Sequence, residues 1–125
     1  MGDNFQNRVF KLKPIDLNEI RNDIMGLLIY GEEPIMAFRD VRDQVVFTNK
    51  RIITINIQGI TGRRRLFETM PYSKIQYFSV QTPGFIELIP DSELFIRFVG
   101  FSVNFEFKGY VDIGSIARII SEFVL

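Results

Sequence analysis

The chain has 125 residues, and its 15 Lys and Arg balance its 15 Asp and Glu. It contains no His, no Cys and no Trp, beside 13 Phe and 4 Tyr. Without His or Cys, it cannot supply a Ser-His-Asp triad, a Cys-His dyad, a zinc finger or an iron-sulfur ligand set. A chain of this length makes one domain whose core can be stable without disulfides. We therefore expect no cofactor and no metal ligand set.

Two further properties concern compartment and partners. No apolar run reaches the roughly 20 residues that a helix needs to span a bilayer, and the N-terminus lacks the basic and apolar regions of a secretory signal. These features predict a cytoplasmic protein. The zero net charge argues against a nucleic-acid partner, because binding to phosphates requires an excess of cations on one surface.

The N-terminal part is predicted to be a flexible arm, residues 1–15, followed by a helix, residues 16–30. Asp16 is the candidate N-cap, Glu19 completes a capping-box pattern, and Gly31 ends the helix. The apolar stripe of this helix needs a partner, either its own domain or a neighbouring chain. Its members are Leu17, Ile20, Ile24 and Leu28.

From residue 34 onward, short β-branched and aromatic runs alternate with turn residues, which is typical of strands. The predicted strands cover residues 35–39, 44–48, 51–57, 64–70, 75–80, 85–89, 94–99 and 102–108. Residues 48–51 are predicted to form a tight reversal, because Asn49 tolerates the left-handed backbone of a hairpin turn. A helix at about 112–124 begins at Asp112, and its wide apolar face predicts that it caps a bent antiparallel sheet.

Four short motifs stand in this strand region. They are Arg42-Asp43, Phe-Thr-Asn-Lys-Arg at 47–51, Gln-Gly-Ile-Thr-Gly at 58–62, and Pro-Tyr-Ser-Lys-Ile at 71–75. Their order and spacing resemble the bacterial pleckstrin-homology (PH) domain family, and the likeness covers about residues 16–125.

The resemblance implies a mainly β (α+β) fold: a PH-like, seven-stranded, bent antiparallel barrel over residues 31–125, capped by the C-terminal helix. The helix at 16–30 is then an addition to it. The resemblance also implies a homo-oligomer, such as the closed rings that some members of the family form. Eukaryotic domains of this fold often bind phosphoinositides through a long basic loop between the first two strands. Here that loop, residues 40–43, is short and as acidic as it is basic, so fold similarity alone does not predict lipid binding.

One group of basic residues is a candidate anion or acidic-lipid patch. Three adjacent arginines could bind an anionic surface, or they could simply be the solvated start of a strand, and both interpretations stay open. The candidate patch comprises Lys50, Arg51, Arg63, Arg64, Arg65 and Lys74.

A second group is a candidate oligomer contact. Strand alternation buries Phe105 and Phe107 and places Phe95 and Phe101 outside, where contiguous apolar side chains mark a protein contact. The candidate oligomer contact comprises Leu17, Ile20, Ile24, Leu28, Phe95 and Phe101.

The close carboxylate pairs are Asp40 with Asp43 and Glu32 with Glu33. Adjacent arginines predict ion pairs at the 40–43 corner rather than a catalytic acid and base. The sequence therefore favours a non-catalytic, self-associating interaction or scaffold module. The alternatives are a peripheral membrane or anionic-ligand binder and, third, a carboxylate-centred hydrolase at Asp40 and Asp43.

Overall fold

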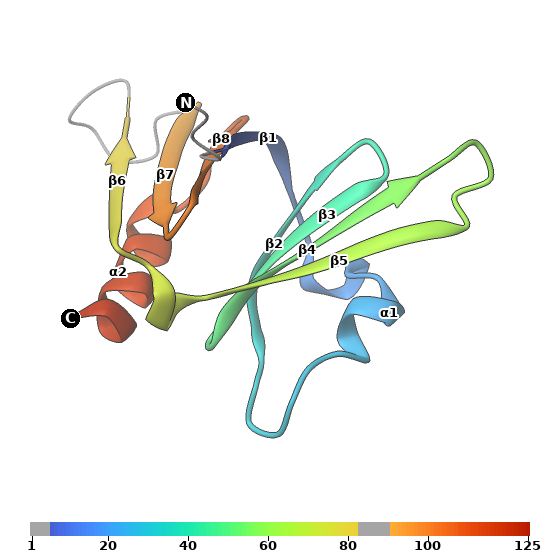
Figure 1. The fold of residues 1–125 in the computed structure, drawn as a ribbon, viewed down its shortest axis with the longest axis horizontal. Coiled ribbons are helices and arrows are strands. Elements are labelled where there is room, and N and C mark those ends of the chain that lie inside the picture. Colours follow the sequence, from blue (N-terminus) through green and yellow to red (C-terminus); the bar gives the residue numbers. More distant parts are fainter. Residues whose placement is uncertain (1–5, 83–90) are drawn as a thin grey trace. The chain divides into compact units, whose positions relative to one another are not determined.

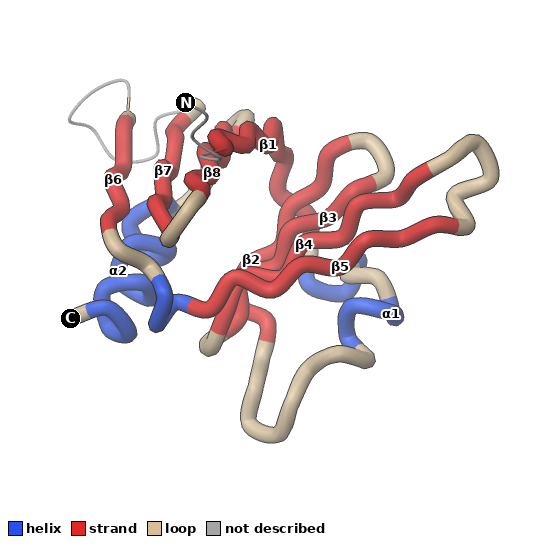
Figure 2. The backbone as a smooth tube through the Cα atoms, viewed as in Figure 1, coloured by secondary structure: helices blue, strands red, loops and turns tan. Residues whose placement is uncertain are grey.

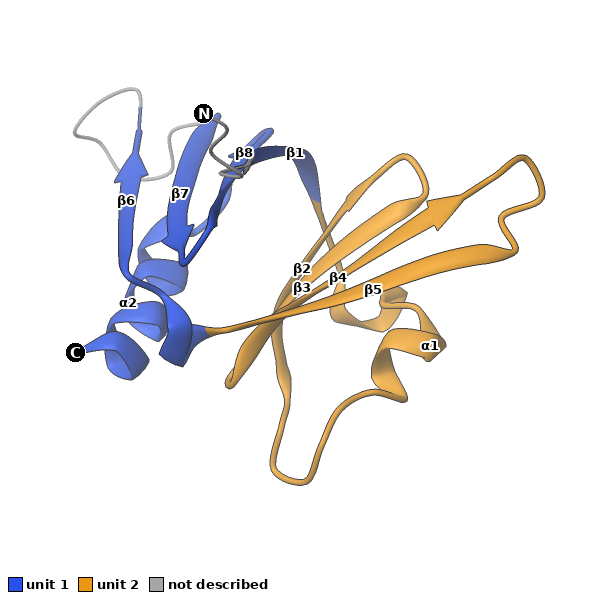
Figure 3. Ribbon diagram, viewed as in Figure 1, with its two compact units in different colours: residues 1–13, 72–125 blue, residues 14–71 orange. Residues whose placement is uncertain are grey.

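The structure, a computed structural model, describes residues 6–82 and 91–125 (Figure 1). The chain divides into two compact units (Figure 3). Unit 1 comprises Met1–Lys13 and Tyr72–Leu125, and unit 2 comprises Pro14–Pro71.

Unit 2 contains a four-stranded antiparallel sheet (Figure 2). Its strands follow one another in space as they do in sequence, in the order β5-β4-β3-β2. Their bounds are β2 Pro34–Asp40, β3 Asp43–Thr48, β4 Arg51–Gln58 and β5 Arg64–Pro71. The predicted strands at 35–39, 44–48, 51–57 and 64–70 are therefore confirmed, as is the reversal at 48–51.

The turn between β4 and β5 requires glycine. Gly59 and Gly62 have φ values of 81° and 69°, in the left-handed region that favours this residue. A Cβ on Gly62 would also lie 3.2 Å from Cγ2 of Ile57, closer than an ordinary van der Waals contact. The Gln-Gly-Ile-Thr-Gly motif thus forms a hairpin turn.

The central strands of unit 2 are buried along most of their length. Residues 45–48 of β3 and 52–55 of β4 are consecutively buried, so both faces of the sheet are shielded from solvent there. The cluster on one face consists of Ile20, Ile24, Ala37, Val46, Ile53, Ile55 and Ile57, with Ile15 and Leu28 packed against it. The N-terminal apolar stripe thus finds its partner within unit 2.

The predicted helix at 16–30 is wrong in its extent. The structure has a 3-10 turn, η1 (Leu17–Glu19), and a four-residue helix, α1 (Asn22–Met25), separated by extended backbone at Ile20 and Arg21. The cause is a side chain from β3: Gln44 accepts a hydrogen bond from Arg21 N at 3.0 Å and donates one to the Glu19 carbonyl at 3.1 Å. These backbone groups would otherwise bond within a continuous helix.

Unit 1 holds four strands that neighbour one another in the order β1-β8-β7-β6. Its strands are β1 Gln6–Ile15, β6 Tyr77–Gln81, β7 Ser92–Phe98 and β8 Phe101–Phe107, and the last two residues of β1 belong to unit 2. The β6-β7 and β7-β8 pairs are antiparallel, as predicted. The predicted strand at 85–89 lies outside the described residues.

The prediction of a flexible arm is wrong for residues 6–15, because β1 pairs in parallel with β8. Phe10 lies opposite Phe105 in this register, and their rings stack at 5.2 Å. Leu12 is buried, and its carbonyl accepts a hydrogen bond from Lys108 N at 2.8 Å. The partner of β1 is remote in sequence, so no local turn signal indicates the pairing.

The C-terminal helix α2 (Ile113–Val124) confirms its prediction. The Asp112 side chain caps it by accepting a hydrogen bond from Ser115 N at 3.1 Å. Its buried residues are Ile116 and Ile120, and its Phe123 ring lies 5.3 Å from that of Tyr72 in η2 (Tyr72–Lys74). Phe105 and Phe107 are also buried, as the alternation predicts.

The burial of Ile24 gives a stability prediction. Ile24→Ala should lower the free energy of unfolding by about 2–5 kcal/mol, because it opens a cavity in the unit 2 core. Leu17→Ala is the matched control at an exposed position, with an expected change within about 0.5 kcal/mol. Urea denaturation measures both, and equal effects would contradict the packing described.

Candidate interaction surface

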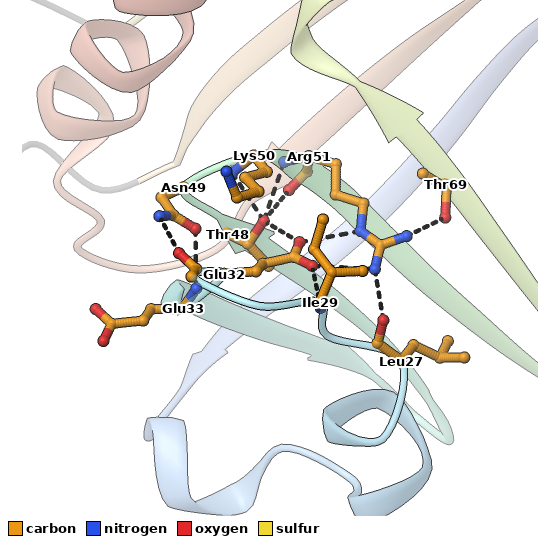
Figure 4. A network of polar contacts seen from close by, with 10 residues as sticks. Leu27, Ile29, Glu32, Glu33, Thr48, Asn49, Lys50, Arg51 and Thr69 are labelled. Atoms are coloured by element: carbon orange, nitrogen blue, oxygen red, sulfur yellow. Dashed lines mark hydrogen bonds and ion pairs between the residues drawn. The ribbon is translucent and has the colours of Figure 1, made fainter.

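The Glu32 carboxylate lies at the centre of a polar network in unit 2 (Figure 4). Its side chain has no exposed surface, and it accepts hydrogen bonds from Arg51 Nε at 2.9 Å and Arg51 Nη2 at 3.1 Å. Thr48 Oγ1 donates to it at 2.6 Å, and Ile29 N donates at 3.1 Å. This buried charge is thus paired and fully hydrogen-bonded.

Arg51 is a predicted patch residue, and the structure engages it inside unit 2. Besides Glu32, its guanidinium donates to the Leu27 carbonyl at 2.7 Å and to Thr69 Oγ1 at 3.1 Å. These bonds tie β4 to β5 and to the segment that precedes β2. Arg51 therefore has a structural role in this geometry.

A second side chain secures the same loop. Asn49 donates to the Gly31 carbonyl at 3.0 Å and accepts a hydrogen bond from Glu33 N at 2.8 Å. Asn49 thus holds the chain that enters β2. The left-handed backbone predicted for it is wrong, because among the described non-glycine residues only Val41 and Asp91 have a positive φ.

Opposing effects determine the pKa of Glu32. Burial raises it, because the charged form loses its hydration, while the hydrogen bonds from Arg51, Thr48 and Ile29 N and the Arg51 charge lower it. Together the lowering effects prevail, so the pKa of Glu32 lies below its ordinary value. The folded protein therefore favours the ionised carboxylate.

Asp23 forms a second anchor on α1. It pairs with Arg21 Nε at 3.1 Å and with Arg65 Nη1 at 3.0 Å. Burial raises the pKa of Asp23, but the hydrogen bond and charge of Arg21 and the charge of Arg65 bring it below its ordinary value. Arg65, another predicted patch residue, thus binds α1 to β5.

The other predicted patch residues are exposed. Arg64 is the first residue of β5 and Arg63 directly precedes it, and within the described part of the chain neither has a carboxylate partner. Lys50 lies in the β3-β4 turn, and Lys74 lies in η2 of unit 1. Of the predicted set, Lys50, Arg63 and Arg64 remain available for a partner on unit 2.

The loop after α1 exposes apolar side chains on a fixed backbone. Leu27 and Ile29 are 40% and 59% exposed, and Tyr30 is fully exposed. The network around Glu32 binds Leu27 O and Ile29 N, so these side chains stand on an anchored chain (Figure 4). Exposed apolar residues that cluster in this way are typical of a contact surface.

The edge strand β5 exposes two more apolar side chains. Leu66 is 46% exposed and Phe67 is 36% exposed, on opposite faces of the strand. Only β4 pairs with β5 among the described strands, so its outer backbone edge has no strand partner there. Sequence reasoning missed Leu66 and Phe67, because it could not show which strand lies at the edge. It missed Ile29 and Tyr30, because it placed both in a helix at 16–30.

The residues of the predicted oligomer contact differ in how far they are buried. Ile20 and Ile24 are buried in unit 2, Leu28 is partly buried and Leu17 is exposed. In unit 1, Phe95 and Phe101 are partly buried, and their rings lie near those of Tyr77 at 6.1 Å and Phe98 at 4.9 Å, respectively. Their role in self-association stays a prediction.

The ion pairs predicted at the 40–43 corner are replaced by other bonds. Arg42 donates to the carbonyls of Gly59 at 2.8 Å and Ile57 at 3.2 Å. Asp43 accepts hydrogen bonds from Ile57 N and Asn56 Nδ2, both at 2.8 Å. The cause is the end of β4, which brings backbone groups within reach of both side chains.

Two properties of residues 6–82 and 91–125 bear on function. No group of three acidic residues there could hold a metal ion. No helix in the same residues is long and apolar enough to cross a membrane.

Nearly the whole chain matches one protein family. Residues 4–124 match the bacterial PH domain family. The chain belongs to this family. The resemblance predicted from the four motifs and the mainly β, PH-like fold are both confirmed.

Two similar proteins in Bacillus subtilis strain 168 are uncharacterised. YjqA is 38% identical over 105 residues, covering 82% of each chain. YozO is 28% identical over 98 residues, covering 78% of this chain and 82% of its own. Neither relative therefore indicates a ligand or an activity for this chain.

Two crystal structures from Shewanella support the fold. A DUF1696 family protein with a pleckstrin-homology domain from S. loihica PV-4 superposes with a TM-score of 0.73 and 31% identity, covering 93% of this chain and 99% of that one. A PH domain from S. amazonensis SB2B gives a TM-score of 0.59 and 33% identity, covering 89% and 90% of the respective chains. The bacterial PH fold thus holds across nearly the whole chain.

The lowered pKa of Glu32 predicts a loss of stability in acid. As the pH falls, the Glu32 carboxylate takes up a proton earlier in the unfolded chain, where the pKa of a Glu is about 4.3, than in the folded protein. The stabilising contribution is therefore present above that value and lost as the pH falls through the lower folded pKa. Urea denaturation from pH 6 to 3 should show a shallower pH dependence for Glu32→Gln than for the wild type.

Glu33→Gln is the matched control, since Glu33 is the exposed neighbour. It should change the free energy of unfolding at neutral pH by less than about 0.5 kcal/mol. At neutral pH, Glu32→Gln should also cost about 1–3 kcal/mol, because it weakens a buried hydrogen-bonded pair. Parallel curves for Glu32→Gln and the wild type would contradict the role of this carboxylate.

Proposed function

We propose that this bacterial PH domain is a non-catalytic interaction module that self-associates through the outer edge of β5. The observation that carries the proposal is the exposure of this strand, whose first four residues, 64–67, are all exposed. An unpaired strand edge offers a row of backbone donors and acceptors to another chain.

The side chains of β5 favour a second copy as the partner. Arg64, Leu66 and Glu68 share one face, because alternate residues of a strand point to the same side. An antiparallel two-fold pairing centred on Leu66 would place Arg64 of each copy opposite Glu68 of the other. Leu66 of one chain would then lie opposite Leu66 of the other chain. The opposite charges of Arg64 and Glu68, directly across the strand pair, would also be favourable.

The absence of His and Cys supports the non-catalytic part of the proposal. At the 40–43 corner, Asp43 is bound to Ile57 N and Asn56, and Arg42 is bound to carbonyls, which is a structural use of both. Both carboxylate oxygens of Asp43 are thus hydrogen-bonded within the protein, which counts against a hydrolase centred on Asp40 and Asp43.

Light scattering coupled to size exclusion, at tens of micromolar protein, tests self-association. We expect a mass above the 14.6 kDa of one chain. Glu68→Lys should reduce this mass, because it would place like charges opposite each other. The charge swap Arg64→Glu with Glu68→Arg should restore the wild-type mass.

Ile60→Lys is the matched control, since Ile60 is fully exposed outside β5. It should leave the mass unchanged. A 14.6 kDa wild-type monomer would overturn self-association. An oligomer that Glu68→Lys leaves intact would show that the contact lies elsewhere than on β5. A mass of more than two chains would favour a ring over a two-fold dimer.

A second candidate function is binding to an anionic membrane surface. The observation that favours it is the exposure of Lys50, Arg63 and Arg64 without carboxylate partners among residues 6–82 and 91–125. Each such cation contributes about 1 kcal/mol at an anionic bilayer.

Co-sedimentation with phosphatidylserine-containing vesicles tests this candidate. Binding at low salt should fall strongly in Arg63→Glu with Arg64→Glu, and added salt should weaken it. Lys11→Glu with Lys13→Glu is the matched control, because both residues are exposed on β1. No vesicle binding by the wild type at low salt would remove this function.

A further inference from the structure

Phe67 on the edge strand β5 is a partly exposed ring beside a buried core. It lies opposite Ile55 of β4, which belongs to the buried cluster of unit 2, whereas Phe67 itself is 36% exposed. No second aromatic ring and no cation stacks on it among residues 6–82 and 91–125. Because β5 forms one edge of the unit 2 sheet (Figure 3), the side of Phe67 away from β4 has no neighbouring strand among the described ones.

Arg65 lies on the same face of β5 as Phe67, because alternate residues of a strand point to the same side. Its guanidinium has a defined position, since Arg65 Nη1 donates to Asp23 Oδ2 of α1 at 3.0 Å. Asp23 is itself held by Arg21, whose Nε and Nη2 donate to its two carboxylate oxygens at 3.1 Å and 3.2 Å. The Arg65 side chain still keeps 44% of its surface exposed. Its hydrogen-bonding edge is thus used within the chain, while its flat faces remain available for stacking.

The two-fold pairing of β5 brings these two side chains together across the strand pair. In an antiparallel pairing centred on Leu66, Phe67 of one chain lies opposite Arg65 of the other chain. Residues directly opposite each other point to the same face, and their Cβ atoms are about 4.5–5.5 Å apart. A guanidinium within about 6 Å of a ring centroid is attracted to the face of the ring. The arginine can stack in this way without giving up the hydrogen bond to Asp23.

We propose that the Phe67 ring of each chain stacks on the Arg65 guanidinium of the other chain, and that Asp23 positions this guanidinium. The inference rests on the proposed function and specifies which side chains hold the two copies together. The symmetry produces two such pairs in each dimer, on the face opposite to the Leu66 contact. Asp23 thereby makes α1 a determinant of self-association, although it acts only through Arg65.

Sedimentation velocity over a concentration series of the full chain tests the stacked pairs through the dissociation constant of the dimer. Phe67→Leu keeps an apolar side chain and removes the ring, and it should raise this constant about tenfold or more, because each dimer loses two pairs. Phe67→Tyr keeps the ring and should stay close to the wild type. Tyr30→Leu is the matched control, because Tyr30 is an exposed ring of unit 2 outside β5. It should leave the constant unchanged.

A double-mutant cycle tests whether the ring and the guanidinium act on each other. Arg65→Gln should raise the dissociation constant of the wild type, but it should add little to Phe67→Leu, because both changes remove the same contact. Multiplicative effects of the two changes would overturn the proposed pair.

The positioning role of Asp23 has its own readout. Asp23→Asn should raise the dissociation constant in the wild-type background and leave it unchanged in the Phe67→Leu background, and Asp23→Glu should stay close to the wild type. An equal increase in both backgrounds would show that Asp23 only stabilises α1, and would overturn its positioning role.

The same measurements separate this inference from the proposed function. A wild-type chain that stays monomeric would overturn both. A dimer that Glu68→Lys weakens, but that Phe67→Leu and Arg65→Gln leave unchanged, would support the β5 pairing and overturn the stacked pairs.

Discussion

The burial of Glu32 against Arg51 is the interaction on which the organisation of unit 2 depends. The sheet offers a face of β-branched residues, and the segment that covers this face precedes β2 and has little helix of its own. Arg51 holds this segment at the Leu27 carbonyl and at Glu32. Removing one partner of such a pair leaves an uncompensated buried charge, which is far more costly than the loss of a surface ion pair.

This arrangement separates structural cations from those available to partners. Arg51 and Arg65 lie in the most basic part of the sequence, yet both bind the chain to itself. Arg64 and Arg39 have no carboxylate partner in the described part of the chain. A chain with balanced total charge therefore still carries arginines that have no carboxylate partner among the described residues.

Much of the fold was predictable from local signals. The hairpin at Asn49, the Asp112 cap and the alternation that buries Phe105 each follow from residues close in sequence. The prediction of a continuous helix at 16–30 failed, because the Gln44 side chain bonds to Arg21 N and the Glu19 carbonyl, which would be bonded within such a helix. The prediction of a flexible arm failed for residues 6–15 for a similar reason, because the strand partner of β1 is β8, which is remote in sequence. The basic residues of the patch could be read from the sequence. The partners of Arg51 and Arg65 could not, because Glu32 and Asp23 reach them only through tertiary packing.

The coupling between Glu32 and Arg51 tests the account most directly. A double-mutant cycle of Glu32→Gln and Arg51→Gln, measured by urea denaturation at neutral pH, isolates their interaction. We predict a coupling energy above about 1 kcal/mol, in the range of residues that share a buried network. Additive single-mutant effects, within about 0.3–0.5 kcal/mol, would contradict the claim that this pair holds the covering segment on the sheet.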